Sequence, residues 1–139
     1  MSLSFWGISL LAAVLQFIVG GIWYTPLFGT LWGKIHGFDA LDKKTQEKMM
    51  GQMAPLFAGQ FIVTVITTVV MAALHQMLPT FSLYLLMGLV WGGFILPAQV
   101  SSVLFGGTPF KWILPKIAVQ AGGSLVCLLV GSAVISYFL

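Results

Sequence analysis

The chain has 139 residues, of which 59% are hydrophobic and 6% charged, with six lysines, no arginine and three acidic residues. Soluble domains carry about 25% charged residues, so this composition excludes an ordinary soluble domain and favours a membrane protein. The charged residues all lie in two short clusters, at positions 34–48 and 111–116, and they form no basic stripe of the kind that binds nucleic acid.

Four long stretches carry no acidic residue, and they cover positions 3–24, 55–77, 81–105 and 112–139. Each is long enough for an α-helix to cross a bilayer, which takes about 20 apolar residues. Helices are favoured over a barrel because the runs are continuous, whereas barrel strands of about 10 residues alternate in polarity. We therefore predict an all-α polytopic membrane protein, in which residues 1–139 form a single domain with four transmembrane helices.

The connection at 25–54 is long enough to hold two short helices, which we predict to form a cytoplasmic amphipathic helical hairpin. Gly37 is expected to end the first of these helices, and Asp39 is expected to cap the second. Apolar residues recur at helical spacing in the first helix, as in a helix that lies in the membrane interface. These residues are Phe28, Leu31, Trp32 and Ile35.

The lysines predict an orientation. If the four helices alternate across the bilayer, all six lysines lie on the side of the connections at 25–54 and 106–111. Positively charged connections face the cytoplasm, so we expect a multi-pass protein of the inner (plasma) membrane with both termini outside. The first span is expected to be retained, because no basic region of a signal peptide precedes it. The expected partners are the lipid bilayer and, at the lysine-bearing face, anionic headgroups.

In each predicted span, a glutamine lies about two turns from the cytoplasmic end. These residues are Gln16, Gln60, Gln99 and Gln120. Lipid cannot satisfy the donors and the acceptor of an amide, so the four side chains are expected to face inward as one polar layer, which is the candidate site. Two interpretations stay open: the amides hold the helices together by hydrogen bonds, or they line a site filled by solute or water.

Other chemistry has little support in the sequence. No span contains Asp or Glu, so the usual carboxylate relay for protons or cations is missing. No spacing typical of a catalytic triad, a phosphate loop or a metal site occurs, so an enzyme is not favoured and we expect no cofactor and no metal. His75 is expected to form an interface hydrogen bond, and Cys127 is the single cysteine, so no disulfide framework is expected.

A motif follows the first span: Trp23-Tyr24-Thr25-Pro26, then Phe28-Gly29 and Trp32. It resembles the hallmark of a bacterial family of small four-helix membrane proteins known only as a domain of unknown function, whose pattern is G-x-x-W-Y-(S/T)-P-x-x-F-G-x-x-W. The spacing from proline to phenylalanine is one residue shorter here, and the similarity continues at 93–97 and 103–109. The resemblance implies the four-span topology and supplies no substrate, cofactor or catalytic residue.

Physically, this motif is suited to the cytoplasmic end of a span. Trp23 and Tyr24 are expected to lie at the interface, and Pro26 to break the span. Phe28 and Trp32 are then expected to hold the next helix flat in the headgroup region.

Two functions are compatible with these features. The first is a structural or partner-binding membrane module that works by packing, with a second copy of the chain as the expected protein partner, because stripes of small residues run along the spans. The alternative is a channel or carrier for a small neutral solute that passes the glutamine layer, since rings of hydrogen-bonding groups can replace hydration.

Overall fold

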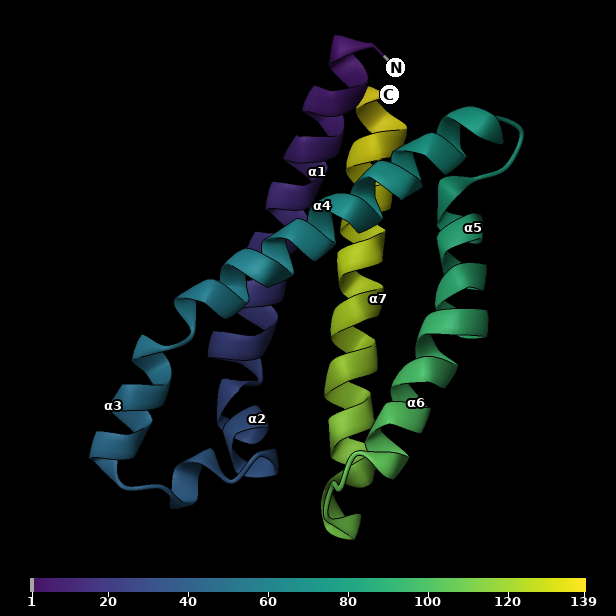
Figure 1. Cartoon of the computed structure of the whole chain (residues 1–139). Helices are drawn as coiled ribbons and strands as arrows, with labels where there is room; N and C mark the ends of the chain where they lie inside the picture. The colour runs from purple at the N-terminus through teal and green to yellow at the C-terminus, as the bar shows by residue number, and fades with distance from the viewer. Residues whose placement is uncertain (1) are drawn as a thin grey trace.

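The computed structural model describes residues 2–139, and every regular element in that range is a helix (Figure 1). Four helical stretches are long and apolar enough to cross a membrane. They are Leu3–Leu27, Ala54–Met77, Leu83–Phe105 and Phe110–Phe138. The predicted all-α class with four long apolar helices is therefore confirmed, and the ends of the stretches lie close to the predicted ones.

These stretches are built from α-helices, two π-helical turns (η1 and η3) and a 3-10 turn (η4), while a further 3-10 turn (η2) lies in the first connection. In chain order the elements are α1 (Leu3–Ile22), η1 (Trp23–Leu27), α2 (Gly29–Ile35), η2 (Phe38–Ala40), α3 (Lys43–Gly51), α4 (Ala54–Met77), α5 (Leu83–Val90), η3 (Trp91–Ile95), α6 (Leu96–Phe105), η4 (Phe110–Trp112) and α7 (Ile113–Phe138). Ser2 caps α1, because its hydroxyl accepts the backbone N–H of Phe5 at 3.3 Å.

Both π-helical turns occur where a proline interrupts a long helix. Pro26 lies inside η1, and Pro97 lies in the first turn of α6, directly after η3. Proline lacks an N–H, and its ring clashes with the carbonyl four residues earlier, so the helix has to widen locally if it is to continue. The first and third stretches therefore stay helical at their prolines, but the hydrogen bonding changes there from the α-helical to the π-helical pattern.

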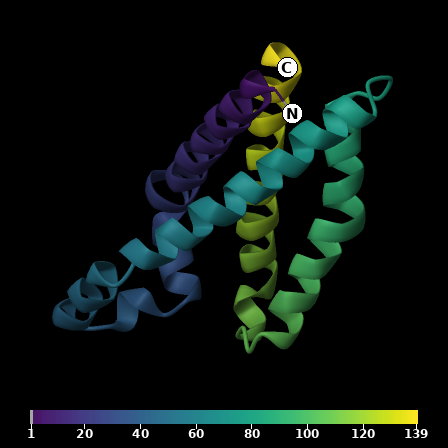
Figure 2. The ribbon, with the colours of Figure 1, turned by 45° about the horizontal axis from the view of Figure 1, so that its top comes forward.

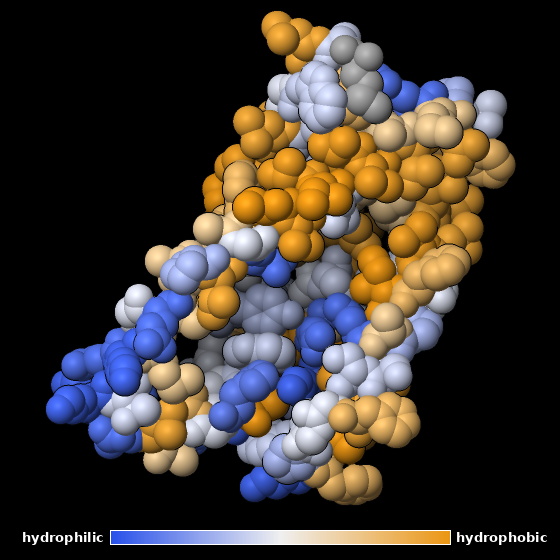
Figure 3. Space-filling view, viewed as in Figure 1, coloured by the Kyte–Doolittle hydropathy of each residue, from blue (hydrophilic) through white to orange (hydrophobic). Residues whose placement is uncertain are grey.

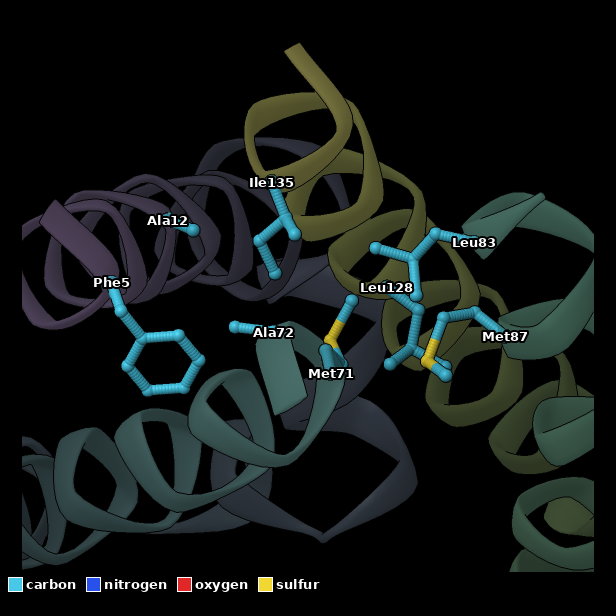
Figure 4. Close-up of a cluster of buried hydrophobic side chains, with 8 residues drawn as sticks. All are labelled: Phe5, Ala12, Met71, Ala72, Leu83, Met87, Leu128 and Ile135. Carbon is cyan, nitrogen blue, oxygen red and sulfur yellow. The ribbon is translucent and has the colours of Figure 1, made fainter. Parts of the chain in front are cut away.

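α7 is the central helix of the bundle (Figures 1 and 2). α1 and α4 contact it from one side and α5 and α6 from the other, and α4 crosses it obliquely. The main hydrophobic core lies toward the two termini, where side chains from α1, α4, α5 and α7 converge (Figure 4). Its buried members are Phe5, Ala12, Met71, Ala72, Leu83, Met87, Leu128 and Ile135.

The two ends of the molecule differ in polarity. Both termini lie at one end, and α2, α3 and the connection between α6 and α7 lie at the other (Figure 1). All six lysines belong to α2, α3, η4 and the beginning of α7, so they share that second end. Figure 3 shows polar residues gathered toward α2 and α3 and apolar residues over α4 and α5.

The outer faces of α4 and α5 are apolar. Long hydrophobic side chains there are exposed: Ile62, Ile66, Leu85 and Leu89. A continuous apolar surface of this kind is unfavourable in water and is compatible with a lipid environment.

The first connection contains the two expected short helices, α2 and α3. α2 ends at Ile35, and Gly37 has a φ of +70°, the left-handed conformation in which glycine terminates helices, as predicted. The predicted cap of α3 was wrong: Asp42, not Asp39, begins it. The Asp42 carboxylate accepts the backbone N–H of Thr45 at 3.2 Å and the Thr45 hydroxyl at 2.5 Å. Asp39 lies in η2 instead, where the chain has not yet reached the start of the helix.

Candidate functional site

Trp23, the first residue of the sequence motif, packs directly on α7. Its indole N–H donates a hydrogen bond to the carbonyl of Val119 at 2.8 Å. The ring lies against Gly122 and Gly123: a Cβ added to either glycine would be 2.8 Å and 2.9 Å, respectively, from the nearest ring atom of Trp23. Only glycine at these two positions lets the ring approach α7 so closely.

Trp91 contacts the same turn of α7. Its indole N–H lies 3.1 Å from the carbonyl of Ala121 and 3.0 Å from the hydroxyl oxygen of Ser124, and both accept from it. The Ser124 hydroxyl in turn lies within hydrogen-bonding distance of Gln99 Oε1, at 3.3 Å, and of the Ala121 carbonyl, at 2.9 Å. The third membrane-length stretch is thus joined to α7 by a small polar network.

We call Trp23, Trp91 and the α7 turn Val119–Ser124 the tryptophan clamp. Each tryptophan is the first residue of a π-helical turn, η1 or η3. Such turns occur frequently at functional sites, because they break the regular hydrogen-bond ladder. In this protein one indole donor comes from η1 and the other from η3, and they bond to carbonyls of α7 that are two residues apart, those of Val119 and Ala121. The clamp therefore fixes both stretches against one turn of the central helix.

Two of the four predicted glutamines make contacts between helices. Gln16 is buried, and its amide donates to Thr68 Oγ1 of α4 at 2.7 Å and to the carbonyl of Ala12 at 3.3 Å. Gln99 bonds to Ser124, as described above. Gln60 is exposed on α4, and Gln120 is partly buried within the clamp turn of α7. None of the hydrogen bonds within residues 2–139 joins one of these glutamines to another.

Gln16 and Gln120 lie at different levels along α7. Gln16 is level with Cys127 and Gly131, since the Cys127 thiol is 3.5 Å from the Gln16 carbonyl and a Cβ on Gly131 would be 2.6 Å from the Gln16 amide. Gln120 lies seven residues before Cys127, or about 10 Å along α7. The prediction assumed parallel helices with matching ends, whereas α4 is oblique and the first stretch continues through η1.

The remaining aromatic residues of the motif pack in two groups between the end of the first stretch and α2. Trp23 packs on Phe28 with ring centroids 4.6 Å apart, and Tyr24 packs on Trp32 at 5.0 Å. Trp32 then packs on His36 at 4.3 Å. The motif thus joins the end of the first stretch to α7 and to α2, a packing role that reasoning from the membrane interface alone missed.

Sequence reasoning also missed Gly122 and Gly123 as members of a site. A signal was present, because adjacent glycines in a long apolar helix permit close approach by a neighbouring side chain. Its partner could not be identified, since Trp23 and Gly122 are far apart in the sequence.

Polar groups elsewhere do not assemble into a metal centre. Among residues 2–139, no group of three His, Cys, Asp or Glu side chains is placed to hold an ion. The hydroxyl of Ser132 and the Nδ1 atom of His75 are buried without a hydrogen-bond partner, so the interface bond expected for His75 is not formed at that nitrogen.

The fold and the clamp define a small all-helical protein with four membrane-length helical stretches, in which packing or indole donors tie the first three to α7, the main helix of the fourth. The chain belongs to the family described as "Protein of unknown function (DUF1761)", whose model matches residues 8–138. The match includes the motif and the whole clamp, and it confirms the resemblance to a family of unknown function. A search of curated proteins and a search of solved structures each found no match to the chain.

Proposed function

We propose that the chain is an integral protein of the bacterial inner membrane that crosses it four times, with both termini outside and the lysines in the cytoplasm. Two features support this topology: four helices have sufficient length and hydropathy to span a bilayer, and all six lysines share one end of the molecule. Anionic headgroups are the electrostatic partner that such an end attracts.

Within the membrane, we propose that the protein is a structural or partner-binding module that associates laterally with a second copy of itself. One observation carries this proposal: Gly88 and Gly92 are exposed on the third stretch, and a Cβ on either would have no neighbour within 4 Å. By contrast, Gly122, Gly123 and Gly131 of α7 are all in tight contact. The chain therefore has one set of glycines that packs internally and another that faces outward.

The outward glycines have the spacing of a helix-association motif. Gly88 and Gly92 lie four residues apart in an apolar stretch, which lets two helix backbones approach closely in lipid, where small residues drive association. If every copy has the same orientation, two such faces are related by a twofold axis along the membrane normal and complement each other. A second copy is therefore the simplest partner.

Passage of a small neutral solute has less support. It would need the glutamines around one passage, whereas Gln16 and Gln99 are engaged in separate hydrogen bonds and Gln60 is on the exposed face of α4.

The test is the double variant Gly88→Leu/Gly92→Leu, compared with Gly59→Leu. Gly59 is also an exposed helical glycine without a neighbour within 4 Å, but it lies on α4. We expect the full chain to form a dimer in liposomes, as counted by single-molecule photobleaching, and the double variant to raise its dissociation constant at least about tenfold. Gly59→Leu should leave it unchanged. A monomeric wild type, or equal effects of the two variants, would refute the proposal.

A further inference from the structure

A basic groove lies at the lysine-bearing end, between the α2–η2 segment and the connection that leads from α6 into α7. Its volume is 630 Å³, within the range of small-molecule sites, which is about 300–1,000 Å³. Six of its lining residues have polar side chains that can interact with a ligand: Lys34, His36, Asp39, Thr108, Lys111 and Lys116.

The charge of this basic groove is strongly one-sided. Three of the six lysines in the chain line it, and Asp39 is the only acidic residue among the lining residues. When His36 is neutral, three lysines against one aspartate leave an excess of two positive charges. Like charges brought together in this way repel one another, so a bound anion with two negative charges would relieve the repulsion.

Several of these side chains are held in place by neighbours. The Lys116 ammonium donates to Thr108 Oγ1 at 3.3 Å, which keeps it beside the connection. The Lys111 ammonium lies 5.5 Å from the centroid of the Trp112 ring. His36 Nδ1–H donates to the carbonyl of Trp32 at 2.9 Å while its ring packs on the Trp32 ring. The groove therefore presents cations whose positions are partly fixed before any ligand arrives.

The backbone of the connection is also unusual. Gly107 has a φ of +73°, a conformation that side chains rarely allow, and it precedes Thr108 within the lining. The buried Ile35 and the partly buried Trp112 add an apolar part to the same lining. The lining of the basic groove thus combines charged, hydroxyl and apolar groups at the lysine-bearing end.

We propose that this basic groove is a binding site for a phosphate group, carried either by an anionic phospholipid or by a small soluble phosphate ester. Phosphate offers several strong acceptor oxygens and up to two negative charges, which match three ammonium donors and one hydroxyl. Lysine-rich pockets between helices at the cytoplasmic side are a recognised type of headgroup site. The inference goes beyond lateral association and does not depend on it, because the groove lies within one chain.

The chain provides a matched control. Lys34→Gln/Lys111→Gln/Lys116→Gln removes the three lysines of the groove, whereas Lys43→Gln/Lys44→Gln/Lys48→Gln removes the three lysines of α3. Both variants lower the formal net charge of +3 by the same amount. Any difference between them therefore reports the position of the charges and not their number. Lys34→Gln/Lys111→Gln is a milder variant, because both residues are exposed and Lys116 keeps its bond to Thr108.

The full chain is placed in nanodiscs of phosphatidylcholine, and two probes are titrated separately. Phosphatidylglycerol is followed by native mass spectrometry of the released protein, and glycerol 3-phosphate by isothermal titration calorimetry. We expect the groove variants to weaken binding of at least one probe by about tenfold or more, and the α3 variant to change it less than about threefold. Lipid binding alone identifies a headgroup site, and binding of the soluble ester identifies a phosphate-ester site. Equal weakening by the groove and α3 variants, or binding of neither probe, overturns the proposal.

Discussion

Gly122 and Gly123 are important because they have no side chain. The Trp23 ring occupies the space that their side chains would fill, and its N–H reaches Val119 only at this short separation. In lipid, where apolar surfaces gain little by leaving the solvent, such close contacts and single hydrogen bonds make up much of the association energy. The tryptophan clamp is therefore expected to be sensitive to the addition of a single methyl group.

Gly123→Ala should destabilise the protein. Alanine is favoured over glycine in a helix by about 1 kcal/mol, but overpacking a filled interface costs about 1–3 kcal/mol, so a net loss is expected. The matched control is Gly7→Ala in α1, where a Cβ would have no neighbour within 4 Å. Thermal unfolding in detergent should give a lower midpoint for Gly123→Ala and an equal or higher one for Gly7→Ala. Equal midpoints for Gly123→Ala and the wild type would contradict the packing described for Trp23.

At this scale the sequence indicated the right residues but not their contacts. Trp23 was predicted to lie at the membrane interface, but the sequence did not indicate that it donates to a carbonyl of α7. Gln16 was predicted to face inward, and it does so, but its partner is Thr68 and not another glutamine. Inward orientation follows from the cost of an unpaired amide in lipid, whereas the identity of the partner depends on how the helices cross.

The start of α3 depends on one capping side chain. Asp42 caps it, and the hydrogen bonds from the hydroxyl and the backbone N–H of Thr45 hold the pKa of the Asp42 carboxyl below its ordinary value. A carboxyl whose pKa is lower in the folded state stabilises that state above its unfolded pKa of about 3.9. This contribution is lost as the pH falls through the folded-state pKa.

Acid should therefore loosen the first turn of α3. We expect amide hydrogen exchange at Thr45 to accelerate as the pH is lowered from about 6 toward 2, after correction for the intrinsic exchange rate. Asp42→Asn keeps an effective cap but cannot titrate, so its corrected protection should not change over the same range. Asp39→Asn should retain the wild-type profile. If Asp39→Asn removed the pH dependence of exchange at Thr45, the assignment of Asp42 as the cap would be contradicted.

The lengths of the long helices were predictable because run length and the absence of acidic residues are direct consequences of the lipid environment. The π-helical turns were not. A proline predicts that the helical hydrogen bonding is disturbed. Whether the helix then ends, kinks or widens depends on which neighbouring helix the side chains at the disturbed turn can pack against. At η1 and η3 that partner is α7, through Trp23 and Trp91, and a single sequence does not contain this information.

For the whole molecule, the central position of α7 is the main result that sequence did not predict. All four long stretches have similar hydropathy, so none stands out as the core of the bundle. The polarity of the two ends was predictable, because lysines at 34–48 and 111–116 must share a side if four helices alternate. The basic groove lies at the lysine-bearing end, and the proposed lateral association requires that all copies share one orientation.

We propose that the lysine-bearing end faces the cytoplasm and that both termini face outward. Cys127 is the only cysteine, so a Cys127→Ser background accepts single reporters at Tyr137, which is 82% exposed near the C-terminus, and at Lys44 of α3. The measurement is labelling of Tyr137→Cys and Lys44→Cys in intact spheroplasts with a membrane-impermeant maleimide. We predict labelling of Tyr137→Cys before permeabilisation and of Lys44→Cys only afterwards. The reverse pattern, or labelling of both before permeabilisation, would contradict this orientation.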